Sequence, residues 1–247
     1  MFKGGTSLSR VFRVTERMSE DIDLVIDRSA LGCDGDRDPS ASAVSGKERD
    51  RRIAALKQAA ARLVAGPFAD SLSRRIRSEL GARGEVRPAV AGLVTPYAAE
   101  ELPEQLHWAT TLVRTITVQR TFWEKLTLLH SIAHRGTAKA IRAKPARHYY
   151  DVYRLWIHGA GREAAADTHL LRDVVRHNST VCQEPRGRGD AAASGALSLV
   201  PGAGIMDAIQ SEYSAMAEEL VFGKVPTLKE VFGVLAEIER VVNEGVR

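Results

Sequence analysis

The chain has 247 residues, of which 44% are hydrophobic, and its formal net charge is +4. That length and apolar content can bury one large core or two modest ones, and we expect two unequal domains. No apolar run approaches the roughly 18 residues that a membrane span needs, and Met1-Phe2-Lys3 does not open a signal peptide, so a cytoplasmic protein without a membrane partner is predicted. Cys33 and Cys182 lack Cys-x-x-Cys spacing, which argues against a zinc site or a disulfide framework.

A pair of glycines stands at the start of the first motif. Gly4 and Gly5 can adopt positive φ and expose consecutive backbone amides, and two hydroxyl side chains follow them directly. The pattern predicts a phosphate-binding turn made of Lys3, Gly4, Gly5, Thr6 and Ser7. Apolar residues at helical spacing then indicate a helix over residues 6–17, whose N-terminus would face a bound phosphate.

Two carboxylates one residue apart come next. The β-branched run of residues 21–26 predicts a strand, and the alternation of its side chains places Asp21 and Asp23 on one face. Such a pair can share divalent cations, because hard oxygen ligands suit Mg²⁺ or Mn²⁺. A two-metal site can activate an attacking hydroxyl and neutralise departing pyrophosphate. On spacing alone, an ordinary turn followed by a solvated strand end is an equally good interpretation.

The middle of the chain alternates loop, helix and strand patterns. Residues 27–52 are rich in Asp, Ser, Gly and Arg and predict a solvated loop, and the acidic run at 34–38 lacks the glycine and glutamate of a calcium loop. A helix carrying Ile53, Leu56 and Leu63 is expected to follow. Further strands are expected at residues 74–80, 86–94 and 111–118, which predicts a mixed sheet with helices packed on it.

From residue 120 onward the apolar spacing becomes helical. We expect one helix beginning near Arg120, a second around Tyr149, and two more that close the chain. The last of these is opened by a Thr227–Glu230 capping box. The aperiodic residues 184–204 predict a loop.

Five motifs occur in a fixed order along the chain. The first is the glycine turn followed by Ser19-Glu20-Asp21-Ile22-Asp23. The other four are a strand ending at Glu79 before Gly81-Ala82-Arg83-Gly84, Thr95 to Glu101, Arg120-Thr121-Phe122-Trp123-Glu124-Lys125, and Arg147 to Asp151. With these motifs the chain resembles the nucleotidyltransferase toxins of the AbiEii/AbiGii type, which are the toxin halves of bacterial toxin–antitoxin and phage-defence pairs.

The resemblance implies an α+β fold. A nucleotidyltransferase-like mixed sheet with flanking helices is expected in residues 1–118, and a C-terminal helical bundle domain in residues 119–247. Family members carry more sequence before the glycine turn, so the first domain is expected to be truncated at its N-terminus.

The resemblance also assigns roles to single residues. It places Lys125 and Asp151 in the active site beside Asp21 and Asp23, with Asp151 orienting Lys125 or a substrate hydroxyl, or acting as general base. On residues alone, Asp151 could instead pair with neighbouring arginines on the helix surface. Glu79 is the candidate third metal ligand, with a solvent-facing edge glutamate as the alternative. The remaining candidates for nucleotide binding are Ser19 and Arg120.

Residues 119–159 contain eight basic side chains and two acidic ones, a net charge of +6. With tyrosines at 149, 150 and 153 available to stack on bases, this segment predicts a surface for an RNA end, although a basic solvated helix is the alternative. His130 and His134 have the spacing of metal ligands but lack the glutamate of a zinc hydrolase. We therefore expect them to be partly exposed surface histidines.

Together these features predict an Mg²⁺- or Mn²⁺-dependent enzyme that moves an NMP from an NTP to an acceptor hydroxyl. The resemblance implies that the acceptor is a tRNA 3′ end, that the activity is toxic, and that a cognate antitoxin protein exists. Two alternatives stay open at this point: a catalytically impaired nucleotide-binding module, and a nucleotidyltransferase that acts on a small-molecule or protein hydroxyl.

Overall fold

The computed structural model of the chain describes residues 1–19, 22–41, 44–63, 78–81, 84–101, 104, 110–134, 144–181 and 192–246. For residue 22 and residues 78–81 it describes the backbone alone. The chain forms two compact units, each built from several stretches. Unit 1 comprises Met1–Val11, Glu20–Thr117 and Thr180–Gln183, and unit 2 comprises Phe12–Ser19, Val118–Ser179 and Glu184–Arg247. The predicted domain boundary at 118/119 stays a prediction.

Among its described residues, unit 1 contains two pairs of strands. β1 (Ile22–Val25) and β2 (Ser78–Gly81) run parallel, whereas β3 (Ala89–Val94) and β4 (Thr111–Ile116) run antiparallel. Phe2 forms single bridges to both β1 and β4. Its N–H donates to the carbonyl of Arg114 (2.9 Å), and its own carbonyl accepts from Ile116 (3.0 Å). The chain therefore combines helices with both kinds of strand pairing.

The first helix is shorter than the sequence predicts. α1 (Gly4–Arg10) packs on β1 but ends seven residues before the expected position at residue 17. The reason lies in the backbone, because Arg13 has a φ of +52°, a left-handed conformation that cannot continue a helix. Residues 16–18 instead pair with the segment after α12, where Arg17 and Val221 form an antiparallel bridge.

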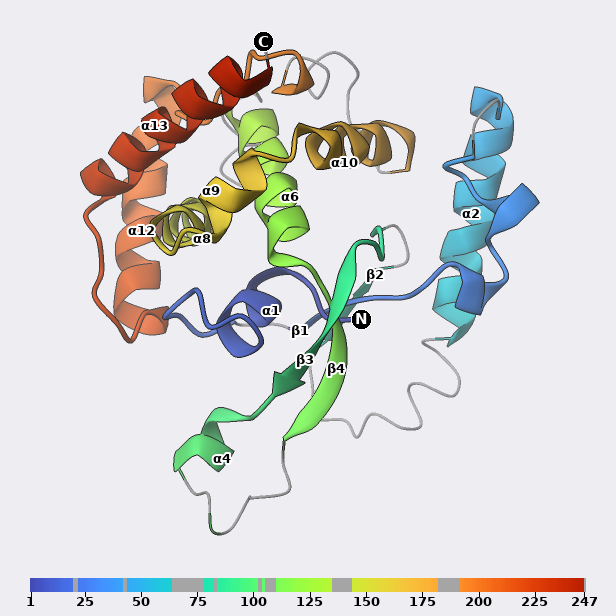
Figure 1. Cartoon of the computed structure of the whole chain (residues 1–247), viewed down its shortest axis with the longest axis horizontal. Coiled ribbons are helices and arrows are strands. Elements are labelled where there is room, and N and C mark those ends of the chain that lie inside the picture. Colours follow the sequence, from blue (N-terminus) through green and yellow to red (C-terminus); the bar gives the residue numbers. More distant parts are fainter. Residues whose placement is uncertain are drawn as a thin grey trace. The chain divides into compact units, whose positions relative to one another are not determined.

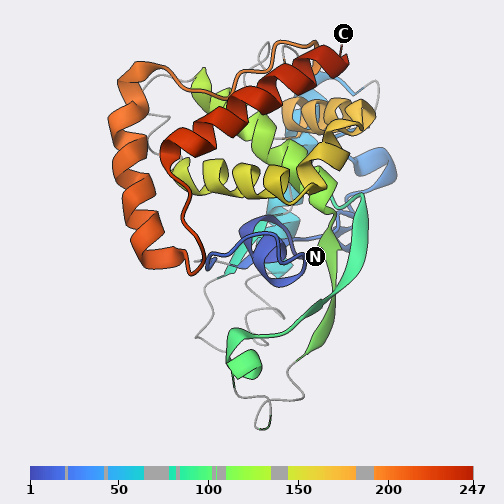
Figure 2. The same cartoon turned by 60° about the vertical axis from the view of Figure 1, so that its left-hand side comes forward.

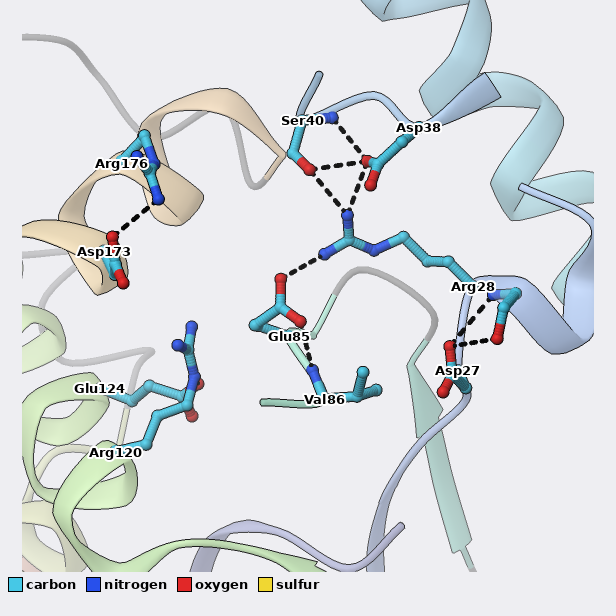
Figure 3. Close-up of polar contacts among 11 residues, drawn as sticks. Asp27, Arg28, Asp38, Ser40, Glu85, Val86, Arg120, Glu124, Asp173 and Arg176 are labelled. Carbon is cyan, nitrogen blue, oxygen red and sulfur yellow. Dashed lines mark hydrogen bonds and ion pairs between the residues drawn. The ribbon is translucent and has the colours of Figure 1, made fainter. Parts of the chain in front are cut away.

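A buried arginine organises the polar segment after β1. Figure 3 shows Arg28 donating to Asp38 Oδ1 (2.8 Å) and Ser40 Oγ (3.0 Å) with one nitrogen and to Glu85 Oε2 (3.0 Å) with another. Asp38 also accepts the backbone N–H of Ser40 at 2.7 Å. The acidic run predicted as a solvated loop is thus held by short contacts, and the following helix α2 (Gly46–Leu63) begins six residues before the end predicted for that loop.

Helices make up most of unit 2, and α8 lies at their centre (Figure 1). α8 (Ala146–Ile157) contacts α6 (Val118–Ala133), α9 (Ala160–Ala165), α12 (Met206–Leu220) and α13 (Leu228–Val246). Figure 2 shows α12 and α13 on two sides of α8. The largest fully buried side chains, Trp123, Trp156, Tyr149, Tyr150 and Phe122, all come from α6 and α8. None of the described helices is long and apolar enough to cross a membrane.

Two of the described helices of unit 2 were not predicted. α9 and α10 (Thr168–Thr180) follow α8 closely, so the sequence between the expected second and third helices is itself largely helical. α10 buries Leu170, Leu171, Val174 and Val175. This spacing is helical and could have been recognised. In unit 1 the short α4 (Tyr97–Glu101) was also missed.

The capping box predicted at the start of the last helix is confirmed. Thr227 donates its backbone N–H to Glu230 Oε2 (2.6 Å), and Glu230 donates its N–H to Thr227 Oγ1 (3.2 Å), which is the reciprocal pattern of a capping box. Residues 197–200, part of the predicted aperiodic loop, are anchored to α13. Glu239 accepts the N–H groups of Leu199 and Val200, so this part of the loop is fixed by side-chain contacts.

The close approach of α9 to α6 and α8 depends on a glycine. A Cβ added at Gly161 would lie 3.0 Å from Phe122 and 3.1 Å from the backbone of Leu155 and Trp156, which cannot easily yield. We expect Gly161→Ala to lower the free energy of unfolding by about 1–3 kcal/mol through overpacking. Urea unfolding followed by circular dichroism measures this change.

Gly233 in α13 is the matched control, because nothing lies within 4 Å of a Cβ added there. Gly233→Ala should raise the free energy of unfolding by about 0.5–1 kcal/mol, the difference in helix propensity between glycine and alanine. A Gly161→Ala variant as stable as Gly233→Ala would contradict the assigned role of Gly161.

Candidate active site

The glycine turn and the second carboxylate of the predicted site lie together in unit 1. Gly4 has a φ of +64°, and a Cβ added there would collide with the Asp23 carboxylate at Oδ2. Lys3 donates its backbone N–H to the carbonyl of Asp23 at 3.1 Å. Two independent constraints, the left-handed backbone and the close approach, thus explain why residue 4 is glycine. The partly exposed Asp23 carboxylate lies directly against the turn.

The other two predicted metal ligands are less fully described. Asp21 lies outside the described residues. The backbone of Glu79 in β2 is in register with Asp23 in β1, so its strand is the neighbour that the prediction required. Among the described residues, no three His, Cys, Asp or Glu side chains cluster as a metal site would need. The role of Glu79 as a metal ligand stays a prediction.

One of the two hydroxyls of the turn has a partner within α1. Ser7 is fully buried and donates its hydroxyl to the Gly4 carbonyl at 2.8 Å, so in this structure it stabilises the turn. Thr6 is also buried. Gly5, the second glycine of the turn, is buried as well. Phosphate binding by these residues stays a prediction. Ser19 belongs to unit 2 and is partly exposed.

Unit 2 contains a buried carboxylate shared by two cations. Asp151 in α8 is fully buried, and both of its oxygens accept from Arg17, Oδ1 from Nε and Oδ2 from Nη2, each at 2.8 Å. Lys125 in α6 contacts the same Oδ2 through Nζ at 2.8 Å. The side chains of Arg17 and Lys125 are only 4% and 8% exposed. The predicted pair of Lys125 and Asp151 is therefore in direct contact.

This arrangement excludes the surface alternative for Asp151. Its helix neighbour Arg154 pairs instead with Glu16 (2.9 Å) and with the carbonyl of Val14 (3.2 Å). Burial alone would raise the pKa of Asp151, but the charges of Arg17 and Lys125 outweigh it and hold that pKa well below its usual range. Asp151 is therefore ionised at neutral pH.

Lys125 has a second contact, with a residue that was not among the predicted site residues. His148 Nδ1 lies 3.3 Å from Lys125 Nζ, a long hydrogen bond. Burial, and after it the charge of Lys125, hold the pKa of His148 well below its ordinary value of 6.5. His148 is therefore a neutral imidazole at neutral pH.

Several residues expected at the surface are buried in unit 2. Tyr149 and Tyr150 are fully buried in the core, so the expectation that they stack on RNA bases is wrong. His130 is also buried, and its Nδ1 accepts the backbone N–H of Ser198 at 3.0 Å, which corrects its assignment as a surface histidine. Arg120 is buried and donates to Glu124 Oε1 at 3.0 Å.

Arg17 and His148 were missed for different reasons. Arg17 meets Asp151 across 134 residues of sequence, and no periodicity reports a contact of that range. His148 lies within the Arg147 to Asp151 motif, but no spacing or charge pattern in the sequence distinguishes it. Cationic residues elsewhere in the chain could have been considered as partners of Asp151, because a buried carboxylate needs cationic or hydrogen-bonding partners.

Comparison with known families agrees with these motifs. Residues 1–237 match the family described as "Nucleotidyl transferase AbiEii toxin, Type IV TA system". The chain therefore belongs to the AbiEii family of nucleotidyltransferase toxins. Membership implies a nucleotide substrate and an antitoxin partner. No curated protein and no solved structure matches the chain.

Removing Arg17 should destabilise the protein strongly. In Arg17→Met, both Asp151 oxygens lose a buried hydrogen bond and one of two cations, which we expect to cost about 3–5 kcal/mol of unfolding free energy. Urea unfolding of the variant and the wild type gives the difference.

Arg162→Met is the control, since Arg162 and its partner Glu237 are both exposed and such a pair contributes at most about 1 kcal/mol. Equal stability of the two methionine variants would show that the Arg17–Asp151 pair does not hold the segment before β1.

Proposed function

We propose that the chain is an Mg²⁺-dependent nucleotidyltransferase that moves an NMP from an NTP to an acceptor hydroxyl, as the toxin of a toxin–antitoxin pair. Two observations support the proposal. The first is family membership over residues 1–237. The second, which carries most weight, is the close approach of the Gly4 turn to the Asp23 carboxylate.

The reaction sets the chemical requirements. The acceptor oxygen attacks the α-phosphorus, its proton is lost, and the bond between the α-phosphorus and the bridging oxygen of the β-phosphate breaks. Pyrophosphate leaves with that oxygen. Because negative charge develops on the leaving group and on the equatorial oxygens, catalysis depends on positioned cations and hydrogen-bond donors.

Unit 1 contains one described carboxylate of the kind that binds a hard divalent cation. Asp23 offers a partly exposed carboxylate, and Asp21 and Glu79 are proposed to complete the set with phosphate oxygens and water. When bound, Mg²⁺ or Mn²⁺ supplies charge neutralisation of the triphosphate and lowers the pKa of a bound hydroxyl. The backbone amides of the glycine turn are proposed to donate to the phosphates.

In unit 2 the geometry favours one of the roles predicted for Asp151. A carboxylate that is fully buried, accepts three charged hydrogen bonds and has a strongly lowered pKa is a poor general base. Asp151 is instead proposed to orient Lys125, whose ammonium neutralises phosphate charge. Arg120, which donates to Glu124, is proposed to assist at the nucleotide.

The transfer reaction itself is the decisive test. The purified chain is incubated with each of the four α-labelled ribonucleoside triphosphates and total RNA, with Mg²⁺ or with excess EDTA. We expect label on RNA when Mg²⁺ is present and no label when excess EDTA removes it. Asp23→Asn and Lys125→Met should each reduce transfer by about 100-fold or more, the scale of losing one preorganised electrostatic contact.

Asp207→Asn and Lys57→Met are matched controls, because both side chains are exposed and neither belongs to the proposed site. Label on protein or on a small molecule would show that the acceptor is a protein or small-molecule hydroxyl instead of RNA. NTP binding without any transfer would identify an impaired nucleotide-binding module. Undiminished transfer in Asp23→Asn would refute the assigned site.

The tRNA acceptor is supported by the family resemblance and by the basic segment of residues 119–159. Some basic side chains of that segment are, however, paired with acidic residues of the same unit. Arg120, Lys125 and Arg154 have acidic partners in unit 2, whereas Lys144 is exposed. Arg142 lies outside the described residues. The exposed part of the segment is therefore the place to test.

Reversing charge at Arg142 and Lys144 should weaken tRNA binding and reduce the slope of log K against log salt by about two, one for each lost phosphate contact. Fluorescence anisotropy of labelled tRNA across a salt series measures both quantities. A double reversal at the exposed residues Lys57 and Arg51 of α2 makes the same change of charge elsewhere. Equal effects of the two double variants would remove this segment as the RNA surface.

A further inference from the structure

Among the residues that the structure describes, the contacts of Lys125 account for two of its three ammonium protons. An ammonium group is a donor with no acceptor capacity, so the carboxylate of Asp151 takes one proton at 2.8 Å. The same rule decides the contact at 3.3 Å, where His148 Nδ1 must be the acceptor. Its proton is then on Nε2, and the imidazole is neutral.

Burial first, and after it the charges around His148, favour this neutral form by lowering the pKa of His148. Lys125 faces it from α6, Arg17 from the segment before β1, and Arg147 and Asp151 from its own helix α8. Three cations and one anion already leave a local excess of positive charge. A proton on His148 would add a fourth cation and remove the acceptor that Lys125 uses.

We propose that His148 is a positioning residue for Lys125, which fixes the direction of the ammonium group so that its third proton is left for a substrate phosphate. This inference rests on the proposed function of Lys125 at the nucleotide. It goes beyond that function because it assigns to His148 a role that is exerted through Lys125. It also makes the site sensitive to protons, since a cationic His148 cannot hold Lys125.

Three substitutions separate a positioning role from a packing role. The side-chain oxygen of asparagine can replace Nδ1 as an acceptor, glutamine places its amide nearer the position of Nε2, and phenylalanine fills the space without an acceptor. We expect His148→Phe and His148→Gln to lower kcat by about tenfold or more, whereas His148→Asn restores most of it. Label transfer from α-labelled NTPs to total RNA gives kcat and KM.

The pH profile adds a readout that packing would not move. In the wild type, kcat should fall on the acid side, well below pH 6.5, as His148 takes up a proton and its pKa is passed. His148→Asn cannot take up that proton, so its profile should lack this acid limb. His158→Asn, a change at an exposed histidine just beyond α8, is the control and should keep the wild-type profile.

Nuclear magnetic resonance tests the geometry without any activity. In protein labelled with ¹⁵N-histidine, the resonances of His148 are those lost in His148→Asn. We expect an unprotonated Nδ1 and a protonated Nε2 at pH 7, and a higher pKa of His148 in Lys125→Met, because the Lys125 charge lowers it. An imidazolium, or a proton on Nδ1, would overturn the proposal.

The activity measurements and the nuclear magnetic resonance measurements together distinguish this inference from the proposed function. If the wild type transfers no nucleotide while His148 shows the neutral tautomer and responds to Lys125→Met, the proposed function fails and the contact stands. If the wild type is active and folded His148→Phe keeps its full kcat, the positioning role is refuted while the proposed function survives. An equal loss in His148→Asn and His148→Phe would refute it as well.

Discussion

The buried carboxylate of Asp151 is the interaction on which the rest of unit 2 depends. It accepts from Arg17 and Lys125, and so ties together the segment before β1, α6 and α8. Such a group is costly to bury unless its charge is compensated and its oxygens are hydrogen-bonded, and here both conditions are met. Two cations around one anion leave a net positive charge, which suits a site that is proposed to meet a polyphosphate.

Local pattern predicted those elements whose causes are local. The capping box at Thr227 and Glu230 and the apolar stripes of α8 and α13 depend on residues a few positions apart, and the structure contains them. The approach of Gly4 to Asp23 also agrees with the motif, because only a residue without a side chain fits there. The roles of Asp21 and Glu79 in metal binding stay predictions.

What the sequence could not predict depends on distant partners. Tyr149 and Tyr150 seemed available for RNA because their helix is basic, yet that helix is surrounded by four others and its aromatic side chains form the core. Arg17 looked like the end of a helix, but the left-handed Arg13 turns the chain so that Arg17 meets Asp151. In each case the deciding contact joins residues far apart in the chain.

The bridge between Arg17 and Val221 has a consequence for how this chain can be divided. Residues 12–19 belong to the same compact unit as most of residues 118–247, so the unit is assembled from stretches that are far apart in the sequence. A fragment that starts near residue 118 would lack Arg17 and would leave Asp151 with a single cation. Recombination or gene splitting at that position would separate partners that only the intact polypeptide brings together.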